Sequence, residues 1–394
     1  MSVSATTNGV RPGVCLSTAK PSNPFIGQVI YMSDTDETAV WDGTYWEGLN
    51  RSRDRNILIN GAMQIHQRGT STASITTSGY YTSDRWRVGL ASMGTWTQSV
   101  ENDAPTGSGF RKSLKMLCTT ADASPAATDI VLVDQGLEGQ NVQNFCKGTA
   151  SARSFTLSFW VKSNVTGTYI AELIDSDNTR QVSASYTITA VDTWQRKIIT
   201  FPADTTGAFD NDNARSLTLS FGLGAGSNAT SGTLNTVWGA TTNANQYVGQ
   251  TNVAAATNNY WQITGVQLEA GSVATPFEFE DIGITLRKCM RYYEKSYNQS
   301  VAPGTNSLPS AFQSASGNQN IPGMRFLVPK RGDATVSIWH WNGTANQVYR
   351  QTDAAAISVS SISGPGEMGP REIIIASSSA NNGYVFHWVA AAEL

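Results

Sequence analysis

The stretch SFTLSFWVKS, residues 154–163, decides the fold class of this chain. From Phe155 to Val161 every second residue is apolar, and the residues between them are Thr, Ser and Trp160. Successive side chains of a β-strand point to opposite faces, so this pattern predicts a strand with one face on a core. Trp160 then lies on the other face, toward solvent or a sister chain.

Similar stretches follow along the chain, separated by clusters of Gly, Asn and Asp. They read YIAELID, ASYTITAV, WQRKIITFP, SLTLSFGLG and NYWQITGVQLE. Strand signals at such short spacing predict a β-sandwich or barrel between residues 56 and 279. The segment Gly222–Asn259 is rich in Gly, Asn, Thr and Ala, and we expect a long surface loop there.

Both ends of the chain predict smaller β units. Residues 27–49, GQVIYMSDTDETAVWDGTYWEGL, contain two short strand patterns and turn residues. A unit of this size is not stable alone in water, so we expect it to dock on a partner through Trp41 and Trp46. The sequence therefore predicts a mainly β chain of four parts, namely a docking segment, a sandwich, a helix and a small β domain: 1–55, 56–279, 280–298 and 299–394.

The predicted helix carries one narrow apolar stripe. Its members fall at i, i+4, i+8, i+11 and i+15, and they are Ile282, Leu286, Met290, Tyr293 and Tyr297. Asp281 is placed to cap the start of the helix. The stripe needs a partner, which is either the preceding sandwich or the same helix in sister chains.

Composition excludes several classes of protein. The net charge is −3 and no Lys/Arg block occurs, which argues against nucleic acid as a partner. No apolar stretch approaches the roughly 20 residues of a membrane-spanning helix, and the first residues do not have the pattern of a signal peptide. The four cysteines lie far apart and the three histidines are scattered, so we expect no zinc site. Small buried thiols are favoured, and disulfides remain an alternative.

Several motifs resemble those of bacteriophage tail-fibre and related virion structural proteins. They are NILINGAMQIHQRGTS (56–71), DQGLEG (134–139), SARSFTLSFWVKSNVTGTY (151–169), QITGVQLEAGSVATPFEFEDIGITLRKCMRYYEKSY (262–297) and WVAAAEL (388–394). Met290 stands where the usual form of the motif around Cys289 has Gln. The resemblance implies a jelly-roll sandwich similar to carbohydrate-binding modules, in a homotrimer of the virion. It does not fix the position in the virion; we expect the tail, with the N-terminal segment docked on other virion proteins. The first residues, which do not have the pattern of a signal peptide, predict synthesis in the host cytoplasm.

The function that we expect is multivalent recognition of the host surface by a trimeric tail fibre or receptor-binding protein. The alternative is a fibre adaptor or capsid decoration protein that binds only other virion proteins, and a third class is a glycan depolymerase. Glycan hydrolysis needs a spaced pair of carboxylates. Turn and cap positions explain Glu269 and Asp281, and the repeats of a parallel β-helix are absent. We therefore predict no enzyme activity.

Recognition of a host glycan would use aromatic rings that stack on sugars. Six tryptophans of the sandwich are candidates, although most such residues belong to cores: Trp86, Trp96, Trp160, Trp194, Trp238 and Trp261. Among them, Trp160 lies opposite the core pattern and Trp238 lies in a polar segment. In the C-terminal domain, Trp339 and Trp341 share one strand face and His340 takes the other. A core role is favoured for this pair, and receptor contact is the alternative.

Two oxygen-rich turns suggest calcium. Asp175–Thr179 and Asp210–Asn213 resemble short calcium loops, although neither has the EF-hand pattern and each is a good turn. We predict no cofactor and no catalytic metal, with a structural calcium ion at these loops as the alternative.

Overall fold

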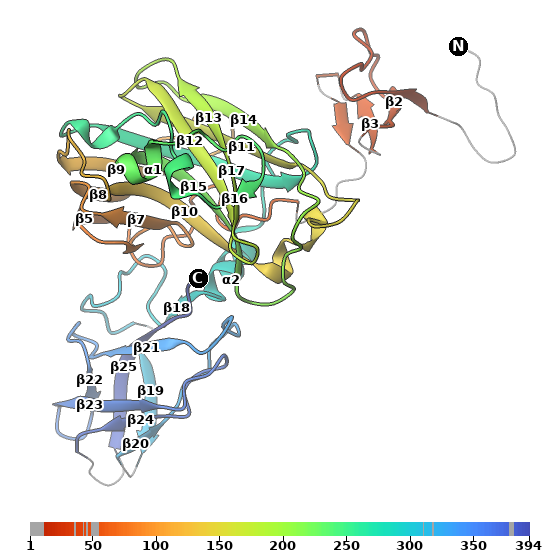
Figure 1. Cartoon of the computed structure of the whole chain (residues 1–394). Coiled ribbons are helices and arrows are strands. Elements are labelled where there is room, and N and C mark those ends of the chain that lie inside the picture. The colour runs from red at the N-terminus through yellow and green to blue at the C-terminus, as the bar shows by residue number, and fades with distance from the viewer. Residues whose placement is uncertain are drawn as a thin grey trace, which may run out of the picture.

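The computed structural model describes residues 12–34, 37–41, 43–44, 46–48, 55–309, 311–316, 319–377 and 382–394. The chain is mainly β, as predicted, and forms a small N-terminal sheet, a jelly-roll sandwich and a C-terminal β domain. Figure 1 shows the sandwich between the two smaller units, with helix α2 (Ile282–Met290) and the C-terminus at its junction with the C-terminal domain. No helix in these residues is long and apolar enough to cross a membrane.

The sandwich consists of two antiparallel sheets. The seven-stranded sheet has the order β16-β13-β12-β15-β10-β7-β6, and the six-stranded sheet has the order β14-β11-β17-β9-β8-β5. The first contains β6 (Gly79–Tyr80), β7 (Arg87–Ala91), β10 (Ile130–Glu138), β12 (Gly167–Asp175), β13 (Arg180–Ile188), β15 (Arg215–Ala225) and β16 (Gly239–Ala240). The second contains β5 (Ser71–Ile75), β8 (Thr95–Glu101), β9 (Ser113–Thr120), β11 (Phe155–Ser163), β14 (Gln195–Phe201) and β17 (Tyr260–Ala270).

One continuous core fills the space between the two sheets. On β11, Phe155, Leu157, Phe159 and Val161 are buried in this core, as their alternation predicts. Aromatic rings lie at its centre, where Phe159 and Phe221 meet edge to face with centroids 5.1 Å apart. The alternation also leaves the outer faces of both sheets with polar residues.

The segment 226–255 is a structured flap and not the plain surface loop that its composition predicts. It contains α1 (Ser227–Thr230), β16 and the 3₁₀ turns η3 (Asn243–Asn245) and η4 (Val253–Ala255). Tyr247 and Ala229 of the flap pack on Ile170, which faces outward from the seven-stranded sheet. Part of the segment therefore covers that sheet, while Trp238, Val253 and Ala254 join the core between the two sheets.

The flap buries an unusual carboxyl group, that of Glu172 on β12. Glu172 is fully buried, and neither of its carboxyl oxygens has a hydrogen-bond partner. Burial raises the pKa of Glu172 to about 8, and the neighbouring Tyr247 and Gln246 offset this effect only in part. Tyr247 instead shares a hydrogen bond of 2.7 Å with Ser220.

The N-terminal sheet consists of β1 (Gly13–Cys15), β2 (Val29–Met32), β3 (Glu37–Trp41) and β4 (Trp46–Gly48). Its core is small and contains Ile30, Met32 and Ala39. Strand β1 pairs in parallel with β2, so the sheet also includes residues that precede the two predicted strand patterns. Such a small core agrees with the expectation that this unit needs a partner.

The C-terminal domain is organised around β25 (Asn382–Ala391), which pairs with four other strands. The remaining strands are β18 (Tyr293–Lys295), β19 (Phe312–Ser316), β20 (Asn320–Pro322), β21 (Thr335–Trp339), β22 (Gln347–Arg350), β23 (Ala355–Ser363) and β24 (Glu372–Ile375). Their apolar side chains form a second core, separate from that of the sandwich.

The predicted helix is shorter than its apolar stripe. Asp281 caps α2 through Gly283 N at 2.8 Å, as expected, but the helix ends at Met290. Tyr293 begins β18, which pairs with β25. The prediction that Tyr293 and Tyr297 continue the helix is therefore wrong. The chain becomes extended after Met290, because Tyr293–Lys295 pair with β25.

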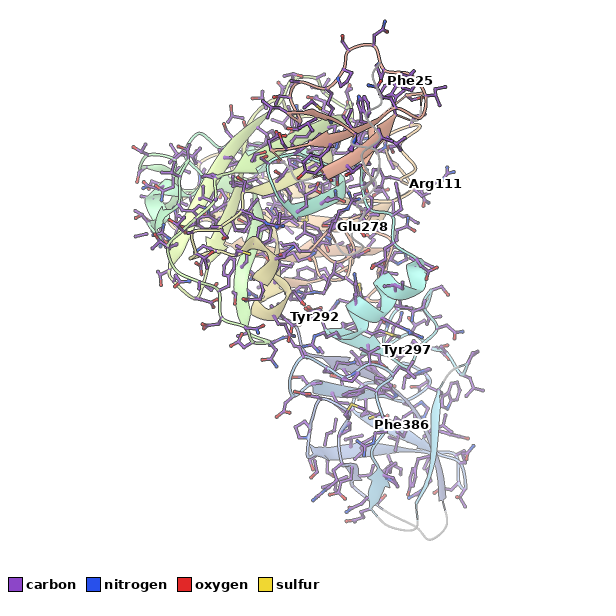
Figure 2. The ribbon with its side chains drawn as sticks, turned by 90° about the vertical axis from the view of Figure 1, so that its right-hand side faces the viewer. Phe25, Arg111, Glu278, Tyr292, Tyr297 and Phe386 are labelled. Carbon is purple, nitrogen blue, oxygen red and sulfur yellow. The ribbon has the colours of Figure 1, made fainter. Side chains whose placement is uncertain are left out.

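Residues 291–295 join the sandwich to the C-terminal domain. Arg291 donates two hydrogen bonds of 2.7 Å to the buried carboxylate of Glu138, and the Tyr292 hydroxyl donates a third of 2.5 Å. On the other side, Glu294 pairs with Lys330 at 2.7 Å. Figure 2 shows Tyr292 and Tyr297 at this junction and Phe386 within the C-terminal domain.

Glu393 closes the junction from the other direction. It pairs with the buried guanidinium of Arg85 at 2.5 Å and with Arg68 at 2.9 Å. Arg85 also stacks on the Tyr292 ring, 3.5 Å from its centroid. A buried guanidinium is tolerated because an anion, a ring and a carbonyl surround it.

Replacing Glu138 tests the junction. Burial alone would raise the pKa of Glu138, but the hydrogen bonds from Arg291 and Tyr292 lower it below its ordinary value. Its stabilising effect is therefore complete above about pH 4.5 and disappears as the pH falls through the lowered pKa. We expect Glu138→Gln to cost about 2 kcal/mol at pH 7 and much less at pH 3. Calorimetric melting at both pH values measures this difference, and an equal loss at both would contradict the assignment.

Replacing Glu172 should have the opposite pH dependence. The unfolded chain loses this proton near pH 4.5 and the folded chain near pH 8, so the stability of the folded state falls as the pH rises between these values. Glu172→Gln removes this slope, and we expect the variant to be more stable at pH 8 by on the order of 3 kcal/mol. Urea unfolding at pH 5 and pH 8 compares the two proteins. Parallel pH profiles would show that Glu172 does not titrate in this way.

Candidate functional site

The outer face of the six-stranded sheet gathers aromatic and polar side chains. Strand register places Trp160 beside Arg196 of β14, and Lys162 beside Gln262 of β17. Gln262 in turn lies beside Lys115 of β9. We call this surface the aromatic face, and its members are Lys115, Trp160, Lys162, Trp194, Arg196, Tyr260 and Gln262, together with Asp103 from the loop after β8.

Asp103 holds one part of the aromatic face together. Its carboxylate pairs with Lys162 and accepts hydrogen bonds from Trp194 Nε1 at 3.1 Å and Gln262 Nε2 at 3.2 Å. Burial alone would raise the pKa of Asp103, but the bonds from Lys162 and Trp194 lower it below its ordinary value. Asp103 is therefore an ionised hydrogen-bond acceptor.

Tyr260 forms the other side of the aromatic face. Its hydroxyl donates to Asp192 at 2.5 Å, and the Lys115 ammonium lies 4.6 Å from its ring centroid. Burial, with Asp192 adding to it, raises the pKa of Tyr260, so the phenol stays protonated. The ring is thus fixed by a hydrogen bond at one end and by a cation above it.

Three phenylalanines limit the aromatic face along β17. Phe110 meets Phe277 edge to face at a centroid distance of 4.8 Å and lies at a tilt to Phe279 at 5.1 Å. Gly265 has φ +63°, and a Cβ there would lie 2.5 Å from the Phe110 ring. A glycine is required at this bulge, and the part of the sheet beside it is covered.

Trp160 remains accessible on the open part. It is half-buried, whereas its chain neighbours Phe159 and Val161 are in the core. Nearby, Ile198 on β14 is 52% exposed and lies in register with Ser158. The Trp160 ring and the Ile198 side chain therefore lie beside the exposed charge of Arg196. Such a surface suits a ligand that has both apolar and polar groups.

The other candidate tryptophans of the sandwich have different places. Trp86, Trp96 and Trp261 are fully buried in the core. Trp238 is 9% exposed, donates to Pro202 O at 2.8 Å and packs against Phe155. The structure thus makes Trp238 a core residue of the flap, against the expectation of ligand contact, because its indole ring closes one end of the sandwich.

The C-terminal aromatic residues form a second, smaller cluster. His340 is 4% exposed and lies between Trp341 and Tyr349, with centroids 5.4 Å from each. Trp339 and Trp341 are half-buried. Burial lowers the pKa of His340, and the side chain of Asn342 offsets this in part. His340 is therefore packed inside, against the expectation of receptor contact, and the two tryptophans and Tyr349 remain partly open.

The predicted interface residues divide into two groups. Ile282 is 52% exposed and Leu286 is half-buried on α2. Met290, Tyr293 and Tyr297 are buried within the chain itself. The stripe is therefore not one surface, and only its first half remains free to contact a sister chain.

In the N-terminal sheet, Trp41 and Trp46 are half-buried and lie against each other, with ring centroids 5.6 Å apart. Three apolar side chains of the same unit have larger exposed fractions than the two tryptophans, and they belong to Val14, Phe25 and Ile26. These residues would contact a partner more readily than the two tryptophans.

A lysine occupies the place suggested for calcium. The Lys147 ammonium is 2.6 Å from Asp175 and 3.0 Å from Asp204, and it also donates to the carbonyls of Thr206 and Gly207. In the second loop, Asp212 accepts from Ala214 N as in a turn. Among the described residues no group of three or more His, Cys, Asp or Glu side chains could hold a metal ion. All four cysteines are free thiols.

One cavity of about 100 Å³ lies elsewhere, between residues 56–64 and α2. Ligand pockets are commonly about 300 Å³ or larger, so this cavity is too small for a sugar ring with its substituents. Its wall includes Glu280, which pairs with Lys288 at 2.6 Å. The aromatic face is therefore the better candidate site.

Comparison with known proteins finds no matching family model and no curated relative. Among solved structures, this chain is similar to the enzymatically active domain of bacteriophage CBA120 tailspike protein 4, with 15% identity, a TM-score of 0.29, and coverage of 55% of this chain and 21% of that one. It is also similar to TmCBM61 in complex with beta-1,4-galactotriose, with 11% identity, a TM-score of 0.29, and coverage of 55% of this chain and 99% of that one. A putative sugar binding protein from Bacteroides thetaiotaomicron gives 11% identity, a TM-score of 0.31 and the same coverage. Such scores assign neither a family nor a function, so function has to be argued from the side chains.

Proposed function

We propose that the chain is a non-enzymatic virion protein of a bacteriophage that recognises a glycan on the host surface. The observation that carries the proposal is the exposed aromatic face, with Trp160 flanked by Lys162 and Arg196. Sugar rings have apolar faces that stack on indole, while amides, carboxylates and cations at the rim bond the hydroxyl groups. The role in a virion, as a tail fibre or other receptor-binding protein, is supported by the sequence motifs.

The geometry favours binding over hydrolysis. Glycoside hydrolysis pairs two carboxyl groups, one of which has a raised pKa and acts as an acid. On the aromatic face Asp103 has a lowered pKa and is occupied by three donors. Glu172 has a raised pKa, but it is sealed under the flap on the other sheet. A depolymerase is therefore the weakest of the three functions considered.

Assembly in the virion is part of the proposal. The small N-terminal sheet lies at the opposite side of the sandwich from the C-terminal domain (Figure 1) and exposes apolar side chains. This arrangement supports docking of the N-terminal sheet on another virion protein, with the far end directed toward the host. A fibre adaptor or capsid decoration protein would also dock through the N-terminal sheet, but it would bind no glycan. Glycan binding therefore distinguishes a receptor-binding protein from these alternatives.

Trp160 is the residue to replace. We expect Trp160→Ala to weaken binding to a cognate bacterial surface glycan at least tenfold, because the stacking surface is lost. The cognate glycan is first found on an array of bacterial polysaccharide fragments, and titration calorimetry then compares the variants. Trp341→Ala in the C-terminal cluster is the matched control. If the control loses binding and Trp160→Ala keeps it, the receptor site belongs to the C-terminal domain.

Substitutions on helix α2 test the proposed homotrimer. Ile282 and Ile284 are 52% and 48% exposed, so replacing both with Asp leaves the fold of one chain intact. We expect the double variant to sediment as a monomer, since a charged pair would be buried between sister chains. Arg287→Gln on the same helix provides a control that keeps these two apolar residues. A variant that remains a trimer would remove α2 from the interface.

A further inference from the structure

The aromatic face is rich in cations, although the chain as a whole has a net charge of −3. Three basic residues project outward from the strands β9, β11 and β14, namely Lys115, Lys162 and Arg196. Arg111 and Lys112 lie on the loop before β9. Figure 2 shows Arg111 on the outside of the sandwich.

The carboxylates near this surface already have partners. Asp103 binds Lys162, Asp192 accepts from Tyr260, and Glu101 accepts from Ser99 at 2.6 Å. Glu269, farther along β17, accepts from Thr275 and Gln267. Lys162 neutralises Asp103, whereas the neutral donors to the other three carboxylates leave their negative charge in place, so the five basic residues of this surface exceed its four carboxylates by one.

Asp103 shows what the donors of this face can bind. An ammonium, an indole N–H and an amide N–H converge on one carboxylate whose side chain is still 46% exposed. Charge-assisted bonds of this kind are stronger than bonds between neutral groups. The same surface chemistry suits a carboxylate supplied by a ligand.

Arg196 provides an unpaired donor on this face. Its side chain is exposed and forms no ion pair or hydrogen bond with the described residues. Its register partner across the strands is Trp160, which places their Cβ atoms about 5 Å apart. A guanidinium offers two parallel N–H groups to a carboxylate, so a sugar stacked on Trp160 would have its acidic substituent within reach.

We propose that the aromatic face binds an acidic saccharide, with one sugar ring stacked on Trp160 and its carboxylate paired with Arg196. This inference rests on the proposed glycan-binding function and adds the chemical class of the ligand. A simpler role for Arg196 would be to protect the edge of β14, where exposed charge discourages pairing with other chains. That role predicts association of the variant and no change in sugar affinity.

The test uses acidic polysaccharide fragments, each paired with its carboxyl-reduced neutral form. Oligogalacturonate, hyaluronate oligosaccharides and acidic capsular fragments supply the pairs, and titration calorimetry at low salt measures the affinities. We expect at least one acidic member to bind tenfold or more tightly than its reduced form, because a charge-assisted pair is lost on reduction. We expect Arg196→Gln to remove this difference, Arg287→Gln on α2 to preserve it, and added salt to weaken it.

The outcomes separate the two proposals. Equal affinity for acidic and reduced forms, or an unchanged preference in Arg196→Gln, would overturn the acidic ligand. Binding of neutral glycans alone, lost in Trp160→Ala, would keep the proposed function and reject only this inference. If neither these pairs nor any glycan on the array binds, the proposed function itself fails. Sedimentation of Arg196→Gln shows separately whether the edge of β14 is protected by charge.

Discussion

The alternation of β11 between two environments is the constraint on which the candidate site depends. The strand must bury Phe155, Leu157, Phe159 and Val161, since they fill the centre of the sandwich core. A shift by one residue would place all four on the outer face. The same register therefore fixes Trp160 and Lys162 outward, beside Arg196 and Gln262 of the neighbouring strands. The site is thus a consequence of core packing and has a rigid sheet beneath it.

The polar junction gives this sheet a fixed relation to the C-terminal domain. Glu138 lies at the end of β10 and receives Arg291 and Tyr292, while Arg85 precedes β7 and receives Glu393. Each interaction joins the sandwich to a segment that continues into a strand of the C-terminal domain, β18 or β25. Pairs of this kind contribute more to geometry than to net stability, because desolvation offsets much of the attraction.

Local pattern was sufficient for the strands and insufficient for the junction. Alternation predicted β11 and the outward direction of Trp160, since both follow from one strand. The spacing of Met290, Tyr293 and Tyr297 was equally regular, yet the chain leaves the helix after Met290 because the next residues pair with β25 as strand β18 and Glu294 pairs with Lys330 inside the C-terminal domain. Trp238 was misplaced because the flap that carries it packs through distant residues such as Pro202. Arg196, Asp103 and Gln262 were missed because register between separate strands cannot be read from one sequence.

Binding of an acidic saccharide at the aromatic face is tested most directly by a crystal structure of the chain with an acidic oligosaccharide bound. We expect a sugar ring over Trp160 on the outer face of the six-stranded sheet, with its carboxylate within hydrogen-bonding distance of Arg196. A ligand seated instead on Trp339 and Trp341 of the C-terminal domain, with the aromatic face empty, would contradict it.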